Sequence, residues 1–379
     1  MNNITYGKQW IEQDDIDIVT EVLRNGNLTQ GEYVPAFEKA LTDYTGAKYA
    51  VSVSSGTAAL HIVYQALGLS ENHEVISCPL TFAATLNAAL YLKAKPVFTD
   101  IHEDSGLINE YQIEKLITDK TKIIAPVHYA GLTCNMDTIN YISHKYNIPV
   151  VEDACHAVGS KYKDSITGSC EYSRAAVFSF HPVKHITTGE GGAVLTNDKE
   201  LYNKCVLLRS HGMKRDDFIY EQDSPLYHEM QFLGYNYRMT DIQAALGLNQ
   251  LKKIDRFIER RREIAQIYYD ELKDIGLITF QQNKDNHFHS YHLFPILFKT
   301  HELRNKVFKK LKEKNIFTQI HYMPVNKHPF YQNMGYKYTD TPIAYDFYLR
   351  ELSIPMYPKL TNDELFFVIE NLIKILKEA

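Results

Sequence analysis

Residues 179–192, SFHPVKHITTGEGG, join two apolar runs, AAVF before them and AVLT after them. The single lysine of this stretch, Lys184, therefore lies in a turn between two predicted buried strands. A lysine in a loop is usually a solvated surface charge, and Gly189, Gly191 and Gly192 are compatible with an ordinary turn. A functional interpretation of Lys184 depends on which other residues the fold places near it.

Short apolar runs rich in β-branched residues recur along the first half of the chain, and helical patterns separate several of them. The predicted strands cover residues 48–54, 74–79, 95–101, 122–129, 148–155, 174–180 and 191–197, and the helical patterns cover residues 57–69, 81–93 and 136–147. Continuous apolar strands with interleaved helices predict an α/β fold whose mostly parallel sheet is covered on both faces. Ligands of such folds bind in the loops at the carboxyl ends of the strands.

The pattern changes after Met239. Thr240 and Gln243 have the spacing of a capping box, and we expect one long helix from there to about residue 273, linking two domains. The remainder predicts a smaller α+β domain, with strands near residues 288–298, 317–323 and 352–356 and helices over 301–314 and 362–377. We place the large domain at residues 1–245 and the small domain at residues 246–379.

The composition favours a globular protein that acts on a small molecule. The chain has 379 residues, 45% hydrophobic and 23% charged, with a net charge of -5. It has no basic stripe for nucleic acid and no polybasic or long apolar segment for a membrane, and its N-terminus lacks a signal-peptide pattern. We expect a cytoplasmic protein whose five scattered cysteines are free thiols, mostly buried.

Two further motifs follow predicted strands. Ser55, Gly56 and Thr57 precede a helical pattern, where free N–H groups and hydroxyls suit a phosphate, although Ser and Thr before a helix are usually only caps. Asp153 lies in VVEDACH, residues 150–156, where an apolar strand ends and a buried carboxylate needs a cationic partner; a helix cap and a metal ligand are the alternatives. Metal is disfavoured because no further ligands follow at metal-site spacing.

A phosphate cradle, a strand-end carboxylate and a strand-end lysine are together the parts needed to hold pyridoxal phosphate. The lysine forms an imine with the cofactor, the carboxylate keeps the ring nitrogen protonated, and the cradle holds the phosphate. Each motif is a weak signal alone, and the combination is much more specific. The sequence therefore predicts a pyridoxal-phosphate enzyme that carries no metal.

These motifs are similar to those of a known family, the DegT/StrS-type nucleotide-sugar aminotransferases. The resemblance covers essentially the whole chain, through SSGTAALH, CPLTFAAT, VEDACHAVGS, SFHPVKHITTGEGGAVLTND, GYNYRMTDIQAALGLNQL and LSIPMYP. It implies the pyridoxal-phosphate transferase fold type I, like aspartate aminotransferase, with a seven-stranded sheet. The segments LTQG, EDACHA and SHGM resemble the subgroup that aminates C4 of a UDP-linked 4-keto-6-deoxy-N-acetylhexosamine for pseudaminic acid.

The resemblance also implies site residues. Lys184 would bond to the cofactor, Asp153 would pair with the pyridine nitrogen, and His156 would lie beside the phenolic oxygen. Phe82 would cover the ring, and the phosphate would be held by Ser55, Gly56, Thr57 and Ser179, with Asn236 from the partner in a homodimer. Candidates for the nucleotide sugar are Tyr6, Asn27, Thr29, His321 and Tyr322. The aromatic side chains among these are equally compatible with simple core packing.

Other functions remain open at this stage. A related sugar dehydratase replaces the lysine by histidine, and here Lys184 is present between His181 and His185. A nucleotide-binding module without chemistry is possible because one fold hosts many functions. A Rossmann oxidoreductase is disfavoured because no G-x-G-x-x-G follows the first strand. Glutamate is the usual amino donor of the family, and the sequence specifies neither the donor, the exact sugar nor the configuration at the new amine.

Overall fold

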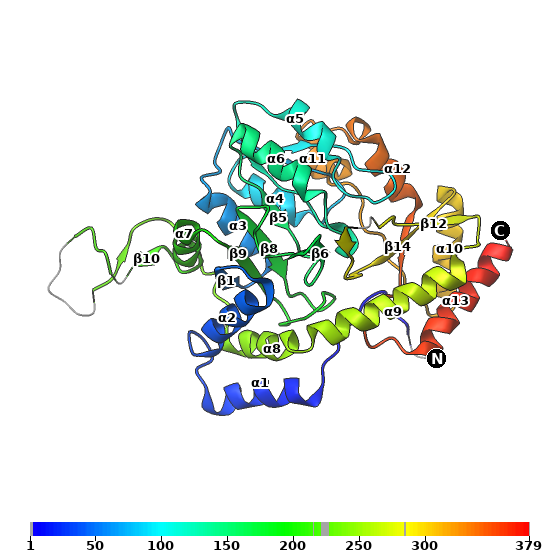
Figure 1. The fold of residues 1–379 in the computed structure, drawn as a ribbon, viewed down its shortest axis with the longest axis horizontal. Helices are drawn as coiled ribbons and strands as arrows, with labels where there is room; N and C mark the ends of the chain where they lie inside the picture. The colour runs from blue at the N-terminus through cyan, green and yellow to red at the C-terminus, as the bar shows by residue number, and fades with distance from the viewer. Residues whose placement is uncertain (1–2, 215, 221–226, 284–285, 379) are drawn as a thin grey trace.

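The computed structural model describes residues 3–214, 216–220, 227–283 and 286–378. In the described chain a central sheet has the strand order β3-β2-β4-β5-β8-β9-β1. Among its strands, Figure 1 labels β5, β8, β9 and β1. Its two halves meet between β4 and β5, where parallel bridges pair Ile124 with Val150 and Val127 with Asp153. The strands are β1 Tyr49–Val53, β2 Glu74–Ser77, β3 Lys95–Phe98, β4 Thr121–Ile124, β5 Val151–Asp153, β8 Ala175–Ser179 and β9 Gly192–Thr196.

All neighbouring strands of this sheet run parallel except β9, which is antiparallel to both β8 and β1. The predicted mostly parallel sheet of seven strands is confirmed. The loop from Phe180 to Gly191 contains no helix to carry the chain back across the sheet for a parallel return, and β9 accordingly pairs with β8 antiparallel. Lys184 lies in that loop, at the carboxyl edge of the sheet.

Both faces of the sheet are buried, which explains the continuous apolar runs. In β8, Ala175 and Val177 pack in one cluster with α3 (Gly56–Ala66), α4 (Ala84–Tyr91) and α7 (Lys199–Arg209). The alternating residues Ala176 and Phe178 pack in another with α2 (Tyr33–Thr45) and α8 (Asp241–Leu251). Successive strand side chains point to opposite faces, so each strand contributes to both cores.

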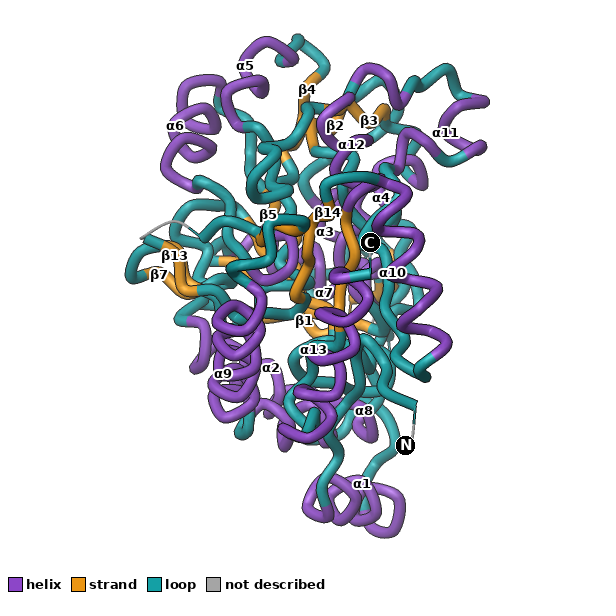
Figure 2. Tube along the Cα trace, turned by 90° about the vertical axis from the view of Figure 1, so that its right-hand side faces the viewer, coloured by secondary structure: helices purple, strands orange, loops and turns teal. Residues whose placement is uncertain are grey.

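The two edges of the sheet lie toward opposite ends of the molecule. Figure 2 shows β2 and β3 at one end with α5 (Ile113–Leu116) and α11 (Pro329–Asn333), and α1 (Gln13–Asn25) with α8 at the other. Helix α6 (Met136–Tyr146) packs Met136, Ile139 and Ile142 into a third cluster with Ile124 of β4. The predicted helices over 57–69, 81–93 and 136–147 are therefore present as α3, α4 and α6.

The single long helix predicted from Thr240 is wrong, because the structure has two helices there. Thr240 caps α8 with the expected capping box, and α9 (Ile254–Leu272) begins after a break at Lys252 and Lys253. No glycine or proline marks the break. Lys253 Nζ instead forms ion pairs with carboxylates of the segment that begins α1, namely Glu12 at 3.2 Å, Asp14 at 2.6 Å and Asp15 at 3.0 Å. The break is therefore accompanied by ion pairs to residues more than 200 positions away, which the local sequence pattern cannot indicate.

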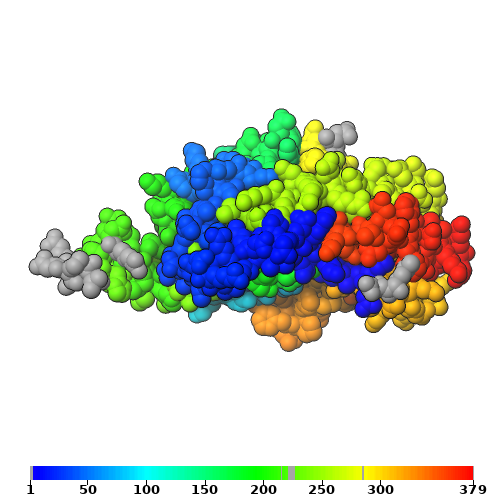
Figure 3. Space-filling view, turned by 90° about the horizontal axis from the view of Figure 1, so that it is seen from below, coloured from blue at the N-terminus to red at the C-terminus, as the bar shows by residue number. Residues whose placement is uncertain are grey.

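A second sheet lies beyond α9 and is antiparallel, in the order β12-β14-β15, with bounds Ile278–Phe280, Phe294–Phe298 and Glu351–Ile354. Its core also includes residues of α9, α10 (His301–Glu313) and α13 (Asn362–Lys377), and Ile4 from the N-terminal segment joins it. A parallel bridge pairs Ile4 with Ile316. Figure 3 accordingly shows the N-terminal stretch in blue running up to the C-terminal region in red.

The strand predictions in this part are only partly right. Strands β14 and β15 and helices α10 and α13 lie where the patterns predict them, whereas residues 317–323 form a single bridge, Gln319 to Ser353, instead of a strand. Beyond Gln319 the backbone leaves the sheet edge, since the His321 amide donates to the side chain of Glu351 instead of to a strand carbonyl. Strand β12 was not predicted. The domain boundary at residue 245 stays a prediction, since α9 contributes residues to two core clusters.

Peripheral elements complete the described chain. Strands β10 (Met213–Lys214) and β11 (Glu229–Met230) form an arm that projects from the body (Figure 1), and β6 (Lys161–Tyr162), β7 (Ser165–Ile166) and β13 (His287–Phe288) form a small sheet. Helix α12 (Pro342–Arg350) precedes β15. The five cysteines are free and four are buried, as expected. The described residues include neither a helix able to span a membrane nor a metal-binding cluster.

Candidate active site

The loop after β1 forms a cradle at the N-terminus of α3. Ser55 caps the helix by accepting a hydrogen bond from the Ala58 amide at 3.1 Å. The first amides of a helix have no partner within it, so those of Gly56 and Thr57 are available to an anion. Ser179, at the carboxyl end of β8, lies against Gly56, since a Cβ added there would be 3.0 Å from the Ser179 Cβ. Backbone amides and hydroxyls from two strand ends thus converge.

Gly192 allows this cradle to close. A Cβ at Gly192 would lie 2.5 Å from both the carbonyl carbon and the oxygen of Ser55, and 2.6 Å from the Gly56 nitrogen. Such contacts are with backbone atoms that cannot move without displacing the start of α3. The last glycine of GEGG is therefore needed because β9 approaches the phosphate cradle closely.

Asp153 ends β5 at the same edge of the sheet and is buried. Thr85 Oγ1 donates a hydrogen bond to Asp153 Oδ2 at 2.6 Å, and the Cys155 amide donates to Oδ1 at 3.2 Å. The described part of the chain gives Asp153 no direct ion pair, although Lys184 is near enough for the carboxylate to act on its pKa. A buried carboxylate held by two hydrogen bonds and no cation suits a protonated ring nitrogen of a ligand.

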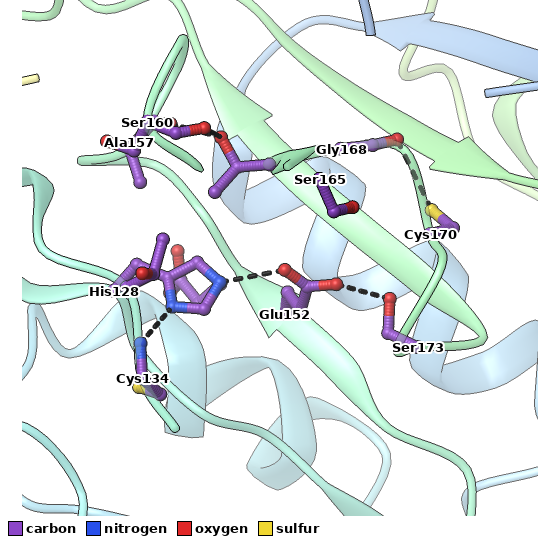
Figure 4. A network of polar contacts seen from close by, with 12 residues as sticks. His128, Cys134, Glu152, Ala157, Ser160, Ser165, Gly168, Cys170 and Ser173 are labelled. Carbon is purple, nitrogen blue, oxygen red and sulfur yellow. Dashed lines mark hydrogen bonds and ion pairs between the residues drawn. The ribbon is translucent and has the colours of Figure 1, made fainter. Parts of the chain in front are cut away.

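Glu152, the other carboxylate of VVEDAC, is used differently. Strand alternation points it to the opposite face, where its Oε2 lies 2.7 Å from Nε2 of His128 and Ser173 donates to its Oε1 (Figure 4). The Cys134 amide donates to Nδ1 of His128, so Nε2 carries the proton that Glu152 accepts. Glu152 therefore has its partners within the protein, and Asp153 is the carboxylate that is left for a ligand.

Lys184 lies in a closed turn between β8 and β9. Backbone hydrogen bonds from Phe180 to Gly191 and from Thr188 to Phe180 hold the base of the turn, and the Lys184 amide donates to His181. Burial lowers the pKa of Lys184, and the nearby Cys155 and Asp153 oppose that shift. In the described chain the ammonium forms no ion pair. A partly buried amine with a lowered pKa is suited to act as a nucleophile and to carry protons.

His156 lies next to this turn and is buried. The Ala130 amide donates to its Nδ1 at 3.4 Å, so its Nε2 carries the proton and donates to the Tyr322 hydroxyl at 2.9 Å. Burial and the nearby Lys184 hold the pKa of His156 well below its usual range. The imidazole is neutral, in a fixed orientation, beside Lys184.

Aromatic residues from other parts of the chain face this edge of the sheet. The ring of Tyr322 lies 6.1 Å from that of Phe82, and the ring of His321 lies 4.9 Å from Tyr322 and 5.2 Å from Tyr6. Phe82 is 63% exposed, which leaves its face open to a ligand. We call Tyr6, His321 and Tyr322 the aromatic wall, and Ser55, Gly56, Thr57, Asp153, Ser179 and Lys184 the sheet wall.

Three predicted residues are not brought to this site within the chain. Asn27 and Thr29 are exposed in the loop between α1 and α2, which is anchored on α8 by a hydrogen bond from the Asp241 amide to Leu28. Asn236 is exposed and forms a bridge with Ser210 near the β10–β11 arm. A role for these three at the site stays a prediction.

The sequence interpretation missed residues that support the predicted ones. Thr85, which holds Asp153, belongs to the same LTFAAT motif as Phe82, so a polar residue in an apolar helical pattern was the available signal. His292, whose ring lies 4.4 Å from that of His156, comes from a predicted strand far along the chain. No local pattern connects His292 to the site.

Comparison with known proteins decides the family. The model of the DegT/DnrJ/EryC1/StrS aminotransferase family matches residues 9–373. The chain belongs to this family. The match spans both sheets, every residue of the sheet wall, and His321 and Tyr322 of the aromatic wall, so the DegT/DnrJ/EryC1/StrS assignment does not rest on one motif.

Several relatives within this family are similar over nearly their whole length. The chain is 42% identical to the UDP-4-amino-4,6-dideoxy-N-acetyl-beta-L-altrosamine transaminase of Campylobacter jejuni serotype O:23/36, covering 99% of this chain and 98% of the relative. It is 40% identical to the spore coat polysaccharide biosynthesis protein SpsC of Bacillus subtilis, with the same coverage. Helicobacter pylori PseC, an aminotransferase involved in the biosynthesis of pseudoaminic acid, superposes with a TM-score of 0.94 at 34% identity, covering 100% of both chains. The predicted fold type I is confirmed.

The protein is a pyridoxal-phosphate-dependent aminotransferase, as DegT/DnrJ/EryC1/StrS members are. The sheet wall fits the cofactor, because its free amides and hydroxyls suit a phosphate and Asp153 lacks a cation of its own. The enzyme class and cofactor predicted from the motifs are thus confirmed. The role of each site residue remains a prediction, and the geometry above makes each one testable.

Proposed function

We propose that the protein transfers an amino group from glutamate to C4 of a UDP-linked 4-keto-6-deoxy-N-acetylhexosamine. The observation that carries this proposal is the 42% identity to the Campylobacter jejuni transaminase across 99% of the chain. Similarity to Helicobacter pylori PseC supports a place in the biosynthesis of pseudaminic acid or a related surface glycan. Free buried thiols fit a cytoplasmic location, which is part of the same proposal.

The sheet wall would hold the cofactor. Bound pyridoxal phosphate supplies an aldehyde carbon that takes the amino group from the donor and passes it to the acceptor. The amides of Gly56 and Thr57 with the hydroxyls of Ser55 and Ser179 would bind its phosphate. Asp153 would accept a hydrogen bond from the ring nitrogen and keep the proton there, because a buried anion favours the charged form of its neighbour.

Lys184 would move the protons of the reaction. Its Nζ would first bond to the cofactor. Once an amino donor has displaced it, the freed amine would take the proton from the donor's α-carbon and return it to the former aldehyde carbon of the cofactor. Burial lowers the pKa of Lys184, which increases the neutral fraction able to accept that proton. His156 would lie beside the phenolic oxygen, with its orientation fixed by Ala130 and Tyr322.

The aromatic wall and the exposed loops would hold the nucleotide sugar. Tyr6, His321 and Tyr322 lie together beside Phe82, and Asn27 and Thr29 would reach the same sugar from the partner subunit. A rigid grip on the nucleotide decides which carbon is presented to the reacting centre.

Incubation with UDP- and dTDP-linked ketosugars and glutamate tests the proposal. We expect product, followed by mass, from the UDP-linked N-acetylated 4-ketosugar, with proton NMR placing the amine at C4 in the altro configuration. An amine at C3, or turnover of dTDP-sugars alone, would contradict the substrate and leave the enzyme class intact. Similarity to a GDP-perosamine synthase, 38% over 344 residues, makes GDP-linked ketosugars the necessary third set.

We also propose that the active unit is a homodimer with shared sites. Asn236 and the β10–β11 arm support this, because the arm projects from the body and carries exposed apolar side chains such as Met230 and Leu233. Asn236 from one subunit would complete the phosphate site of the other. Mixing inactive Lys184→Ala with inactive Asn236→Ala should restore activity, since one mixed site is intact. Demonstrated subunit exchange without recovery would show that Asn236 does not act across the interface.

A related dehydratase, which carries histidine in place of the lysine, is disfavoured. Lys184 occupies the turn beside Asp153, whereas His181 is exposed and His185 is buried with its Nε2 3.2 Å from the Ser290 carbonyl oxygen. Neither imidazole therefore substitutes for Lys184 in this structure.

A further inference from the structure

A buried carboxylate outside the sheet wall is connected to the aromatic wall. Glu351 begins β15 with 0% of its surface exposed. Its Oε2 accepts a hydrogen bond from the backbone amide of His321 at 2.8 Å, and its Oε1 lies 2.6 Å from Ser353 Oγ. Ser353 Oγ also lies 2.9 Å from Nδ1 of His321. These contacts form a continuous line from Glu351 through Ser353 to the imidazole.

The single proton of the Ser353 hydroxyl couples the two ends of this line. When Glu351 is ionised, Ser353 donates to Oε1 and must accept from Nδ1–H of His321, which leaves Nε2 as a bare acceptor. When Glu351 is neutral, its Oε1–H donates to Ser353, Ser353 donates to Nδ1, and Nε2 carries the proton. In both states Oε2 accepts from the His321 amide, so the backbone does not change.

The His128–Glu152 pair shows what such an arrangement looks like without this coupling. There the Cys134 backbone amide, which can only donate, occupies Nδ1 of His128, and the carboxylate meets Nε2 directly (Figure 4). Only one tautomer satisfies both contacts. The Ser353 hydroxyl can either donate or accept, so both tautomers of His321 can satisfy their contact with it.

We propose that Glu351 is a positioning residue that acts through Ser353 to set which ring nitrogen of His321 carries the proton. His321 Nε2 then offers the site a donor or an acceptor according to the state of Glu351. The relay rests on this geometry alone; its effect on the ketosugar rests on the proposed function. It assigns a role to a carboxylate and a hydroxyl that lie outside the cofactor site.

The charges around the relay allow the exchange to occur near neutral pH. Burial raises the pKa of Glu351 to about 8, while Arg304 of α10 opposes the shift. Tyr129 and Tyr322 also face Glu351, and burial holds the pKa of each far above its usual value, so both stay neutral. Burial and Lys184 lower the pKa of His321 to about 3. His321 therefore stays neutral and changes tautomer instead of charge.

Solid-state ¹⁵N spectra of ring-labelled histidine in the holoenzyme test the relay directly, with His321→Gln assigning the signal. We expect His321 to carry its proton on Nε2 below the Glu351 titration and on Nδ1 above it. Glu351→Gln should show Nε2–H at every pH, because its amide oxygen accepts from the His321 amide while its NH₂ donates to Ser353. We call this pH-dependent change of the His321 tautomer the crossing. A His321 tautomer that does not change with pH in wild type, or a crossing that persists in Glu351→Gln, overturns the proposal.

Matched variants separate the relay from a loss of structure. Ser353→Thr keeps a hydroxyl and should keep the crossing, whereas Ser353→Ala should abolish it, and this pair decides the question if Glu351→Gln does not fold. Glu152→Gln should leave the His321 crossing unchanged. A crossing lost equally in Ser353→Thr and Ser353→Ala counts against the hydroxyl.

The effect on the site is measured with the ketosugar. We expect the KM for the ketosugar to change about tenfold in wild type as pH passes through the Glu351 titration, and to stay constant in Glu351→Gln. The reason is that in one of the two tautomers His321 Nε2–H faces a hydrogen-bond donor of the sugar and loses that hydrogen bond. A tautomer crossing with no change in KM overturns the effect on the acceptor. An enzyme that shows the crossing and aminates no UDP-ketosugar contradicts the proposed function and supports the relay.

Discussion

The two walls of the site differ in how the chain builds them. The sheet wall comes from the carboxyl ends of β1, β5 and β8 and the turn after β8, so neighbouring strands bring its residues together. The aromatic wall joins Tyr6, near the N-terminus, to a loop more than 300 residues later. The first is a consequence of sheet topology. The second depends on the core of the second sheet, in which Ile4 pairs with Ile316 and Gln319 with Ser353. We expect the sheet wall to govern cofactor chemistry and the aromatic wall to govern the acceptor.

The largest effect should come from the sheet wall. Lys184→Ala should reduce turnover by several orders of magnitude, because it removes the cofactor's covalent partner and the proton carrier together. Circular dichroism should match wild type, and the visible absorbance of the bound cofactor should change. Turnover near the wild-type rate would contradict the assignment of Lys184.

Adjacent carboxylates in VVEDAC provide the next test. Asp153→Asn should slow the single-turnover rate by about 10²–10⁴-fold, with the cofactor bound more weakly, because the charge beside the ring nitrogen is lost. Glu152→Gln is its control: it disturbs the pairing with His128 and should lower Tm by a few °C without changing the rate per folded enzyme. An unchanged single-turnover rate in Asp153→Asn would mean that another group protonates the ring.

Tyr322→Phe tests the contact between the aromatic wall and His156. The Tyr322 hydroxyl is the partner of His156 Nε2, so its removal leaves a buried donor unpaired, which costs roughly 1–3 kcal/mol. We expect about a tenfold lower rate, together with an altered spectrum of the bound cofactor. His156→Phe should produce the same spectral change, and the double variant should add little. Additive effects would show that Tyr322 acts on the acceptor independently of His156.

The smallest effect should appear in the pH dependence of stability. Folded Glu351 keeps its proton up to about pH 8, whereas the unfolded chain ionises near the ordinary glutamate value. The native state therefore binds more protons in this window, so the Glu351 contribution is complete below it and is lost as pH rises through 8. Glu351→Gln should flatten the fall of Tm between about pH 5 and 8 by a few °C. An identical pH profile in both proteins would contradict the raised pKa.

The sheet wall could be predicted from the sequence pattern much better than the aromatic wall. Apolar runs ending in polar motifs predicted the seven strands and the order of the cradle, Asp153 and Lys184, because strand ends of a parallel sheet share an edge. The pattern could not separate Glu152 from Asp153 in function, since both end one apolar run and only their partners differ. The helical pattern predicted one helix in place of α8 and α9, because the partners of Lys253 lie near the N-terminus and leave no local signal.

The aromatic wall was reached only through family resemblance. Periodicity predicted a strand over residues 317–323, where the structure has one bridge, and it gave no signal for the links from His321 to Ser353 and Glu351. Tertiary hydrogen bonds between distant polar residues leave no local pattern to detect. Only the three-dimensional structure reveals them.

The packing of Ile4 determines the order in which parts of the chain can fold during synthesis. Every other buried residue of its cluster lies at position 264 or beyond, so its partners leave the ribosome after most of the chain has been made. At typical elongation speeds the N-terminal segment waits on the order of tens of seconds for those partners. Tyr6, two residues along, can reach its place beside His321 only afterwards. A nascent chain can therefore assemble the cofactor cradle before the segments that complete the pocket for the acceptor have been made.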